Sequence, residues 1–190
     1  DSMASMIGTC AHEIFEQLAQ AGYPNWSNEK IDGQRLIWRC RLLQQGVKLQ
    51  EVDAALDTVS QAVIAILNSD TGKWLLDATH RSAHNELAVS CFSSDAGMSV
   101  KRYVIDRSFI DKNNVRWIID YKITAPDVAD TEGEGLDAFI EQQKKLYSPQ
   151  LLNYKNLLTQ LDESSNELIA DTKCALYFPL IDSLVELSDL

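Results

Sequence analysis

The segment that constrains the fold most is a strand–turn–strand pattern in the middle of the chain. Residues 100–110 and 115–123 form short apolar or alternating runs, and the four residues between them are Asp111-Lys112-Asn113-Asn114. Asparagine tolerates the left-handed backbone conformations that tight connections require. The pattern therefore predicts a β-hairpin, and any fold of this chain has to contain it.

The length of the hairpin loop decides which side chains share a face of the sheet. With a three-residue loop over 112–114, Asp111 pairs with Val115, and the antiparallel register places Asp106 opposite Asp120. A four-residue loop would place these two carboxylates on opposite faces, because successive strand residues alternate between faces. We adopt the three-residue loop.

Two acidic side chains that face each other across neighbouring strands repel each other unless something offsets their charge. A divalent cation would do so, and Lys122 lies two residues beyond Asp120, which places it on the same face. This set suits phosphodiester hydrolysis: the metal would polarise the phosphate and lower the pKa of an attacking water. The lysine would orient or deprotonate that water or offset the developing charge. Taken alone, the triplet Asp120-Tyr121-Lys122 favours a second interpretation, a solvated and salt-bridged hairpin.

Helices and further strands are expected around the hairpin. Apolar residues spaced three or four apart predict helices at 10–21 after a Thr9 cap, at 27–46, 52–67 and 136–147, and from Ser148-Pro149 to about 161. Strands are expected at 86–92 and 173–178, and the turn-like Asp70-Thr71-Gly72 is expected to follow the third helix. Together these elements predict an α/β fold, with a mixed central β-sheet flanked by helices.

In the second helix, the residues expected to face inward are Leu36, Ile37, Cys40 and Leu43. Trp38 lies between Arg35 and Arg39, an arrangement that could stack on a base of a single strand. A tryptophan in such a position more often lies at the edge of a core while the arginines are solvated. We adopt the core interpretation.

Length and composition set the class of protein. The chain has 190 residues, of which 45% are hydrophobic and 24% charged, so we expect one globular domain over 8–190, with residues 1–7 as a cut end or cloning scar. The longest apolar run, Ala62–Leu67, is too short to span a bilayer, and we expect a soluble cytoplasmic protein with no membrane contact. Four cysteines without a CxxC pair predict free thiols and no iron–sulfur cluster.

The charge of the chain is unevenly distributed. The formal net charge is −11, whereas residues 101–122 carry six basic and three acidic side chains. This net negative charge argues against a freestanding protein that binds nucleic acid through the electrostatic field of the whole molecule. An anionic ligand has to be bound locally.

Additional polar residues follow one another in a recognisable order. They are G-T-x-x-H at Gly8–His12, Glu86, I-D-R at Ile105–Arg107, I-I-D-Y-K at Ile118–Lys122, and Q-x-x-x-Y at Gln150–Tyr154. In this order they resemble the RecB-type nuclease domain of the PD-(D/E)xK superfamily, found at the C-terminal end of RecB- and AddA-like helicase–nuclease subunits. The resemblance runs from Gly8 to about Tyr154, and residues 176–179 are also similar.

The resemblance implies a role for each of these residues. It implies that Asp106 and Asp120 are metal carboxylates and that His12 and the Tyr121 carbonyl are further ligands. Lys122 would be the catalytic lysine, and Glu86 would bind or orient a second metal or a water. Gln150 and Tyr154 would position the DNA backbone. Oxygen ligands with one imidazole suit Mg²⁺ or Mn²⁺. We interpret His80 and His84 as surface residues of a polar loop.

The function implied is that of an exonuclease domain of an ATP-dependent helicase–nuclease, which hydrolyses DNA during recombinational double-strand break repair. The chain has no G-x-x-x-x-G-K-[ST] motif, so a helicase module elsewhere in the complex would deliver the single strand. Two alternatives remain open. One is a non-catalytic interaction domain of the same fold, and the other is a freestanding single-strand exonuclease.

Overall fold

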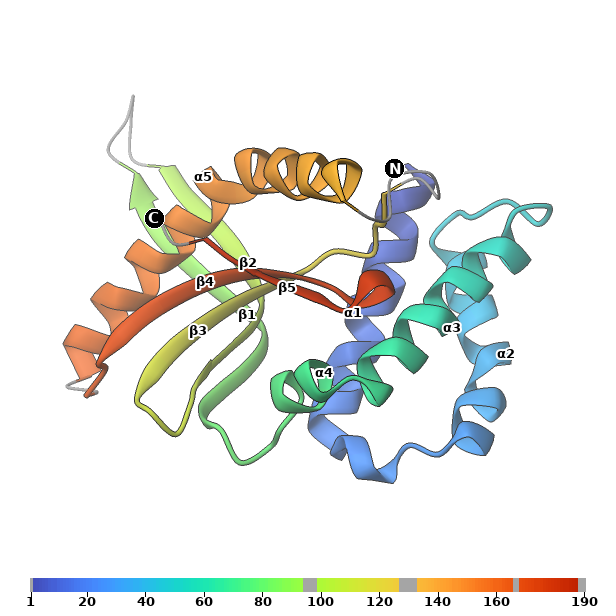
Figure 1. Ribbon diagram of the computed structural model, residues 1–190, viewed down its shortest axis with the longest axis horizontal. Helices are drawn as coiled ribbons and strands as arrows, with labels where there is room; N and C mark the ends of the chain where they lie inside the picture. Colours follow the sequence, from blue (N-terminus) through green and yellow to red (C-terminus); the bar gives the residue numbers. More distant parts are fainter. Residues whose placement is uncertain (1, 94–98, 127–132, 166–167, 188–190) are drawn as a thin grey trace. The chain divides into compact units, whose positions relative to one another are not determined.

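The computed structural model describes residues 2–93, 99–126, 133–165 and 168–187 (Figure 1). Contacts divide the chain into two compact units. Unit 1 comprises Asp1–Ala78, Tyr121–Ala125 and Phe178–Leu184. Unit 2 comprises Thr79–Asp120, Pro126–Tyr177 and Val185–Leu190.

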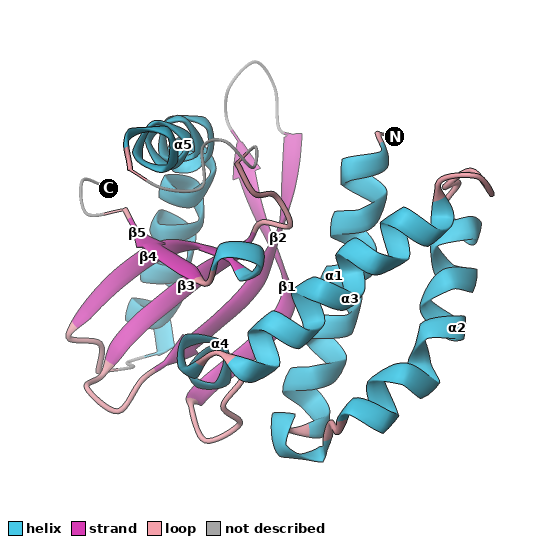
Figure 2. Cartoon of the chain, turned by 45° about the vertical axis from the view of Figure 1, so that its right-hand side comes forward, coloured by secondary structure: helices cyan, strands magenta, loops and turns pink. Residues whose placement is uncertain are grey.

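Unit 1 is built mainly from helices (Figure 2). They are α1 (Met3–Ala21), α2 (Asn28–Gln44), α3 (Val52–Asn68) and α4 (Asp70–Leu75), with short 3₁₀ turns at Tyr23–Asn25 and Pro179–Ile181. α3 packs against both α1 and α2. None of the described helices is long and apolar enough to cross a membrane.

The first helix begins earlier than the sequence predicts. The side chain of Ser2 caps it by accepting a hydrogen bond from the Ser5 amide, and Ile7 is buried. The hydroxyl of Thr9 donates to the Ser5 carbonyl, so Thr9 is an interior helix residue and its expected role as a cap is wrong. Residues 3–7 therefore belong to the fold.

The inward face expected for α2 is also wrong. Its buried residues are Ile31, Trp38 and Leu42, whereas Leu36 and Ile37 are 69% and 48% exposed and Cys40 is exposed. The helix has apolar residues on two faces, and the face with the large indole ring removes more apolar area from water. Trp38 is only 1% exposed, which confirms its assignment to the core.

The segment expected as a turn after α3 is the short helix α4. Ser69 caps it by accepting a hydrogen bond from the Gly72 amide at 3.0 Å. A Cβ atom at Gly72 would lie 2.0 Å from the Ile66 carbonyl oxygen, so only glycine allows the two helices to approach this closely. The glycine that suggested a turn in the sequence is required instead for close packing of α4 against α3.

A five-stranded sheet forms most of unit 2. Its strands are β1 (Arg81–Ser93), β2 (Ser99–Ile110), β3 (Val115–Tyr121), β4 (Asp171–Phe178) and β5 (Ser183–Glu186), in that spatial order. β1 and β2 are antiparallel, as are β2 and β3. The Ala170 amide bonds to the Asn114 carbonyl at 2.8 Å, so β3 and β4 start at the same end and run parallel. The predicted α/β class, a mixed sheet flanked by helices, is confirmed.

The hairpin has the register that the three-residue loop predicts. The Asp111 amide bonds to the Val115 carbonyl at 2.9 Å, and Arg107 pairs with Ile119. One step further along both strands, Asp106 lies opposite Asp120. The side chains of both aspartates therefore share one face of the sheet.

The carboxylate of Asp111 holds this turn together. Its Oδ1 accepts the Asn113 and Val115 amides at 2.8 and 3.0 Å, and its Oδ2 accepts the Trp117 indole N–H at 3.1 Å. Burial acts to raise the pKa of this carboxyl group, but these hydrogen bonds, together with the nearby His80, outweigh burial and lower the pKa below its ordinary value. The ionised form of Asp111 therefore stabilises the folded hairpin.

The longest helix, α5 (Glu134–Ser165), contains Pro149, and Figure 1 shows that it bends sharply. Two separate helices were expected here, with Ser148 as the cap of the second. Ser148 instead donates from its hydroxyl to the Lys144 carbonyl at 2.6 Å, within one continuous helix. Beyond the proline, α5 buries Leu151, Tyr154, Leu158 and Asp162.

We predict that Asp111→Asn lowers the free energy of unfolding by about 1–3 kcal/mol at pH 7, because an amide cannot accept from both backbone amides and the indole. The folded pKa of Asp111 is lower than the unfolded one, so this stabilisation is present above about pH 4 and is lost as the pH falls through the folded pKa. Urea unfolding at pH 7 and pH 3 measures the difference.

The control is Asp32→Asn, which changes an exposed acid on α2. It should leave the stability unchanged to within about 0.5 kcal/mol at both pH values. A loss in Asp111→Asn that stayed constant between pH 7 and pH 3 would contradict the proposed role of the charge.

Candidate functional site

A row of three acidic residues crosses three neighbouring strands of unit 2. Asn85 pairs with Arg107 and Leu87 with Ile105, which places Glu86 opposite Asp106. Asp106 in turn lies opposite Asp120. We call Glu86, Asp106 and Asp120 the carboxylate row.

Two carboxylates of the row lie close together, and the third is buried. Carboxylate oxygens of Glu86 and Asp106 lie within 4.8 Å, and Asp120 is only 3% exposed. Two negative charges this close repel each other, and a buried carboxylate loses favourable contact with water. A divalent cation with oxygen ligands would remove both penalties, so the donor set fits Mg²⁺ or Mn²⁺.

The backbone of Glu86 is unusual for a strand. Its φ angle is +48°, in the left-handed region that side chains other than glycine rarely adopt. Such a conformation costs about 1–3 kcal/mol and persists only where surrounding contacts impose it. Nothing in the local sequence signals this conformation, and it occurs at a residue that the sequence assigned to the site.

Gln150 and Tyr154 contact Asp120 from α5. The Nε2 group of Gln150 donates to Asp120 Oδ1 at 3.3 Å and to the Tyr154 hydroxyl at 2.7 Å. The Tyr154 hydroxyl donates to the Val104 carbonyl at 2.8 Å. A hydrogen-bonded chain therefore links Asp120 to the backbone of β2 through two side chains of one helix.

Tyr154 is 5% exposed, and burial raises the pKa of its hydroxyl, as do the charges of Asp120 and Asp106. The hydroxyl is therefore neutral and able to donate over the physiological pH range. The predicted contact of Gln150 and Tyr154 with the DNA backbone stays a prediction. The geometry gives both residues a second role, which is to orient Asp120.

Three residues implied by the resemblance belong to unit 1. His12 lies on α1, and its Nε2 is 2.9 Å from the carbonyl oxygen of Tyr121. Phe15, one turn further along α1, packs edge-on against the Tyr121 ring at 5.0 Å between centroids. Lys122 directly follows the end of β3 and is half-buried.

The His12–Tyr121 distance fits two interpretations. It is a normal hydrogen bond when the imidazole carries its proton on Nε2. It is also the separation of two adjacent ligands of an octahedral Mg²⁺, which lie about 2.9 Å apart when each metal–ligand bond is about 2.0–2.1 Å. The distance is therefore compatible with the ligand roles that the resemblance implies for both groups.

Other residues considered in the sequence lie elsewhere. His80 stacks on Phe109 with 4.0 Å between ring centroids, and His84 lies within β1 rather than in a loop. Burial raises the pKa of Cys10 to about 11 and that of Cys174 to about 12, so both thiols are inert near neutral pH. Among the described side chains, the free cysteines are Cys10, Cys40 and Cys174.

No protein-family model and no curated protein matches the chain.

Sequence reasoning missed the buried ion pair of Arg116 with Asp162. The Nε atom of Arg116 donates to Asp162 Oδ2 at 2.9 Å, and both side chains are at least nine-tenths buried. The pair joins β3 to α5 on the face that carries Asp120. The two residues are 46 positions apart, so no local pattern could have paired them.

We predict that Tyr154→Phe lowers the free energy of unfolding by about 1–3 kcal/mol, because it leaves the Val104 carbonyl and the Gln150 amide short of a partner in a buried position. Chemical denaturation measures the change. The matched control is Tyr23→Phe, which removes the hydroxyl of a half-buried tyrosine in the first 3₁₀ turn. Equal losses in the two variants would contradict a specific role for the Tyr154 hydroxyl.

Proposed function

We propose that the chain is a divalent-metal-dependent DNA nuclease domain that acts as an exonuclease within a helicase–nuclease. The observation that carries the proposal is the carboxylate row: the strand register places Glu86 opposite Asp106 and Asp106 opposite Asp120. Carboxylate oxygens of Glu86 and Asp106 lie within 4.8 Å of each other. A solvated hairpin would not require three acids to share one face, one of them buried. The motif order that resembles RecB-type nucleases supports the same conclusion.

Each residue of the candidate site would have a separate role in hydrolysis. Glu86, Asp106 and Asp120 would hold Mg²⁺ or Mn²⁺, and the resemblance adds His12 and the Tyr121 carbonyl as ligands. When bound, the cation polarises the scissile phosphate and lowers the pKa of an attacking water. Gln150 fixes one oxygen of Asp120, which keeps the carboxylate in a single orientation. Lys122 would orient that water, take its proton or offset negative charge at the phosphate.

The charge distribution supports delivery of DNA by another module. Residues 101–122 are net basic while the chain as a whole carries −11. Affinity for a polyanion depends on the number of phosphates neutralised, so the domain should bind DNA weakly by itself. Attachment to a helicase would raise the effective concentration of the strand to roughly millimolar without new contacts.

The first test of this function is the effect of metal on stability. Mg²⁺ or Mn²⁺ should raise the melting temperature of the wild type, because a ligand at about 100 times its Kd stabilises the folded state by about 2.7 kcal/mol. Asp120→Asn should abolish most of this shift, while Asp32→Asn should retain it. Equal metal affinity of wild type and Asp120→Asn in calorimetry would refute the ligand assignment.

The second test separates metal binding from chemistry. Lys122→Ala should keep the metal-dependent rise in melting temperature, because an ammonium group does not ligate a cation. Its cleavage of a labelled single strand should fall by about two orders of magnitude or more. Lys112→Ala, which changes an exposed lysine of the hairpin loop, is the control and should cleave normally. Cleavage at the wild-type rate by Lys122→Ala would assign the chemistry to another group.

A further inference from the structure

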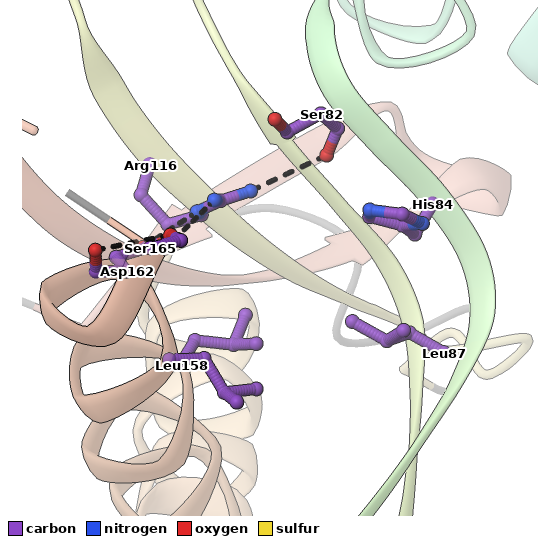
Figure 3. A pocket seen from close by; sticks show the side chains of 8 residues that line it. Ser82, His84, Leu87, Arg116, Leu158, Asp162 and Ser165 are labelled. Carbon is purple, nitrogen blue, oxygen red and sulfur yellow. Dashed lines mark hydrogen bonds and ion pairs between the residues drawn. The ribbon is translucent and has the colours of Figure 1, made fainter. Parts of the chain in front are cut away.

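Unit 2 contains a pocket of about 370 Å³ between β1, β3 and the second half of α5 (Figure 3). Its volume falls within the range of small-molecule sites. Its walls include His84 and Leu87 from β1, Arg116 from β3, and Leu158, Leu161 and Asp162 from α5. The proposed hydrolysis uses none of these residues.

The charges in the pocket are paired within the protein. Arg116 makes two hydrogen bonds to the Asp162 carboxylate, and its Nη1 donates to the Ser82 carbonyl at 3.3 Å. A guanidinium neutralised in this way offers no net charge to a phosphate. The guanidinium and the carboxylate still have hydrogen-bonding capacity beyond these contacts, so the polar end of the pocket can both donate and accept.

The remaining walls suit a flat, uncharged group. Leu87, Leu158 and Leu161 supply apolar surface, and His84 supplies an imidazole ring. Aromatic and apolar surfaces bind nucleobases by stacking, and polar groups at the edge bind the hydrogen-bonding groups of the base. A nucleobase has this combination of an apolar face and a polar edge, whereas a phosphate does not.

The pocket begins next to the carboxylate row. His84 pairs with Ser108, which places both residues two positions from Glu86 and Asp106, or about 7 Å along the strands. That separation is of the order of one nucleotide. Ser108 is fully buried, and its hydroxyl has no hydrogen-bond partner among the described residues.

The backbone on both sides of His84 is distorted. Ser82 and Glu86 have φ angles of +43° and +48°, and the register of β1 against β2 shifts between Arg81 and His84. Irregularities of this kind redirect side chains and are common beside functional sites. Here they lie in β1, which lines the pocket with His84 and Leu87 and carries Glu86 of the carboxylate row.

We propose that this pocket holds one nucleobase of the DNA strand, next to the nucleotide whose phosphate lies at the carboxylate row. The biological meaning of the proposal rests on the proposed nuclease function. The affinity of the pocket for a base requires neither metal nor cleavage, so it can be measured separately.

The test is a titration of the whole chain, labelled with ¹³C at the leucine methyl groups, with the uncharged nucleosides 2′-deoxyadenosine and 2′-deoxycytidine. A chelator removes divalent metal. Saturable shifts of the Leu87, Leu158 and Leu161 methyl signals are expected, with a Kd of the order of millimolar. A base-free deoxyriboside should cause none. Absence of saturable shifts with both nucleosides, or equal shifts with the base-free sugar, would overturn the proposal.

Two variants on the pocket walls and one control sharpen the test. Leu161 and Leu152 both lie on α5 and are 50% and 40% exposed, but only Leu161 lines the pocket. Leu161→Ala and His84→Ala should weaken nucleoside binding by about fivefold or more, whereas Leu152→Ala should not change it. Unchanged binding in Leu161→Ala and His84→Ala would overturn the assignment of the pocket.

A capped leucine amide serves as a probe for a peptide partner. If it shifts the pocket methyl signals while nucleosides do not, the site binds peptide and the proposal is wrong. Metal-dependent cleavage is measured in a separate assay. Nucleoside binding without cleavage would reject the nuclease function and keep the base pocket, and cleavage without nucleoside binding would do the reverse.

Discussion

The arrangement of the acidic residues depends on the hydrogen bonds of one carboxylate, that of Asp111. By accepting two amides of the loop and the Trp117 indole, Asp111 selects a three-residue connection between β2 and β3. That connection sets the register in which Asp106 lies opposite Asp120. A slip of one residue would move Asp120 to the opposite face, away from Gln150 on α5. The geometry of the candidate site is thus decided at the far end of the hairpin that carries it.

The sequence predicted the features that depend on local chemistry. Alternation of apolar residues located β2 and β3, and the residues Asp111 to Asn114 predicted the turn that the structure contains. The register followed from counting residues through that turn. Two aspartates of the site were therefore paired from the sequence alone, because in a hairpin the partner of each residue is fixed by loop length.

Features that depend on contacts between residues far apart in the sequence could not be predicted in the same way. In α2, two apolar faces compete for the core, and burial of Trp38 leaves Leu36 and Ile37 exposed. At Pro149 the local signal for a helix start was overridden within one continuous helix. The left-handed conformation of Glu86 leaves no trace in the sequence, since strain of this kind is imposed by the surrounding structure.

The helix α5 contacts both Asp120 and Arg116 on the face of the sheet that carries the carboxylate row. Near its middle, Gln150 and Tyr154 restrain Asp120, and about two turns after Tyr154, Asp162 neutralises Arg116. Because Asp120 and Arg116 lie four residues apart on one strand, both contacts act on the same rigid segment of β3. A change on the pocket side of α5, such as Leu161→Ala, alters an exposed wall without touching either restraint. Such a change can therefore separate recognition of a base from the geometry that hydrolysis requires. A concurrent loss of metal affinity in that variant would show that the base pocket and the metal site are coupled through α5.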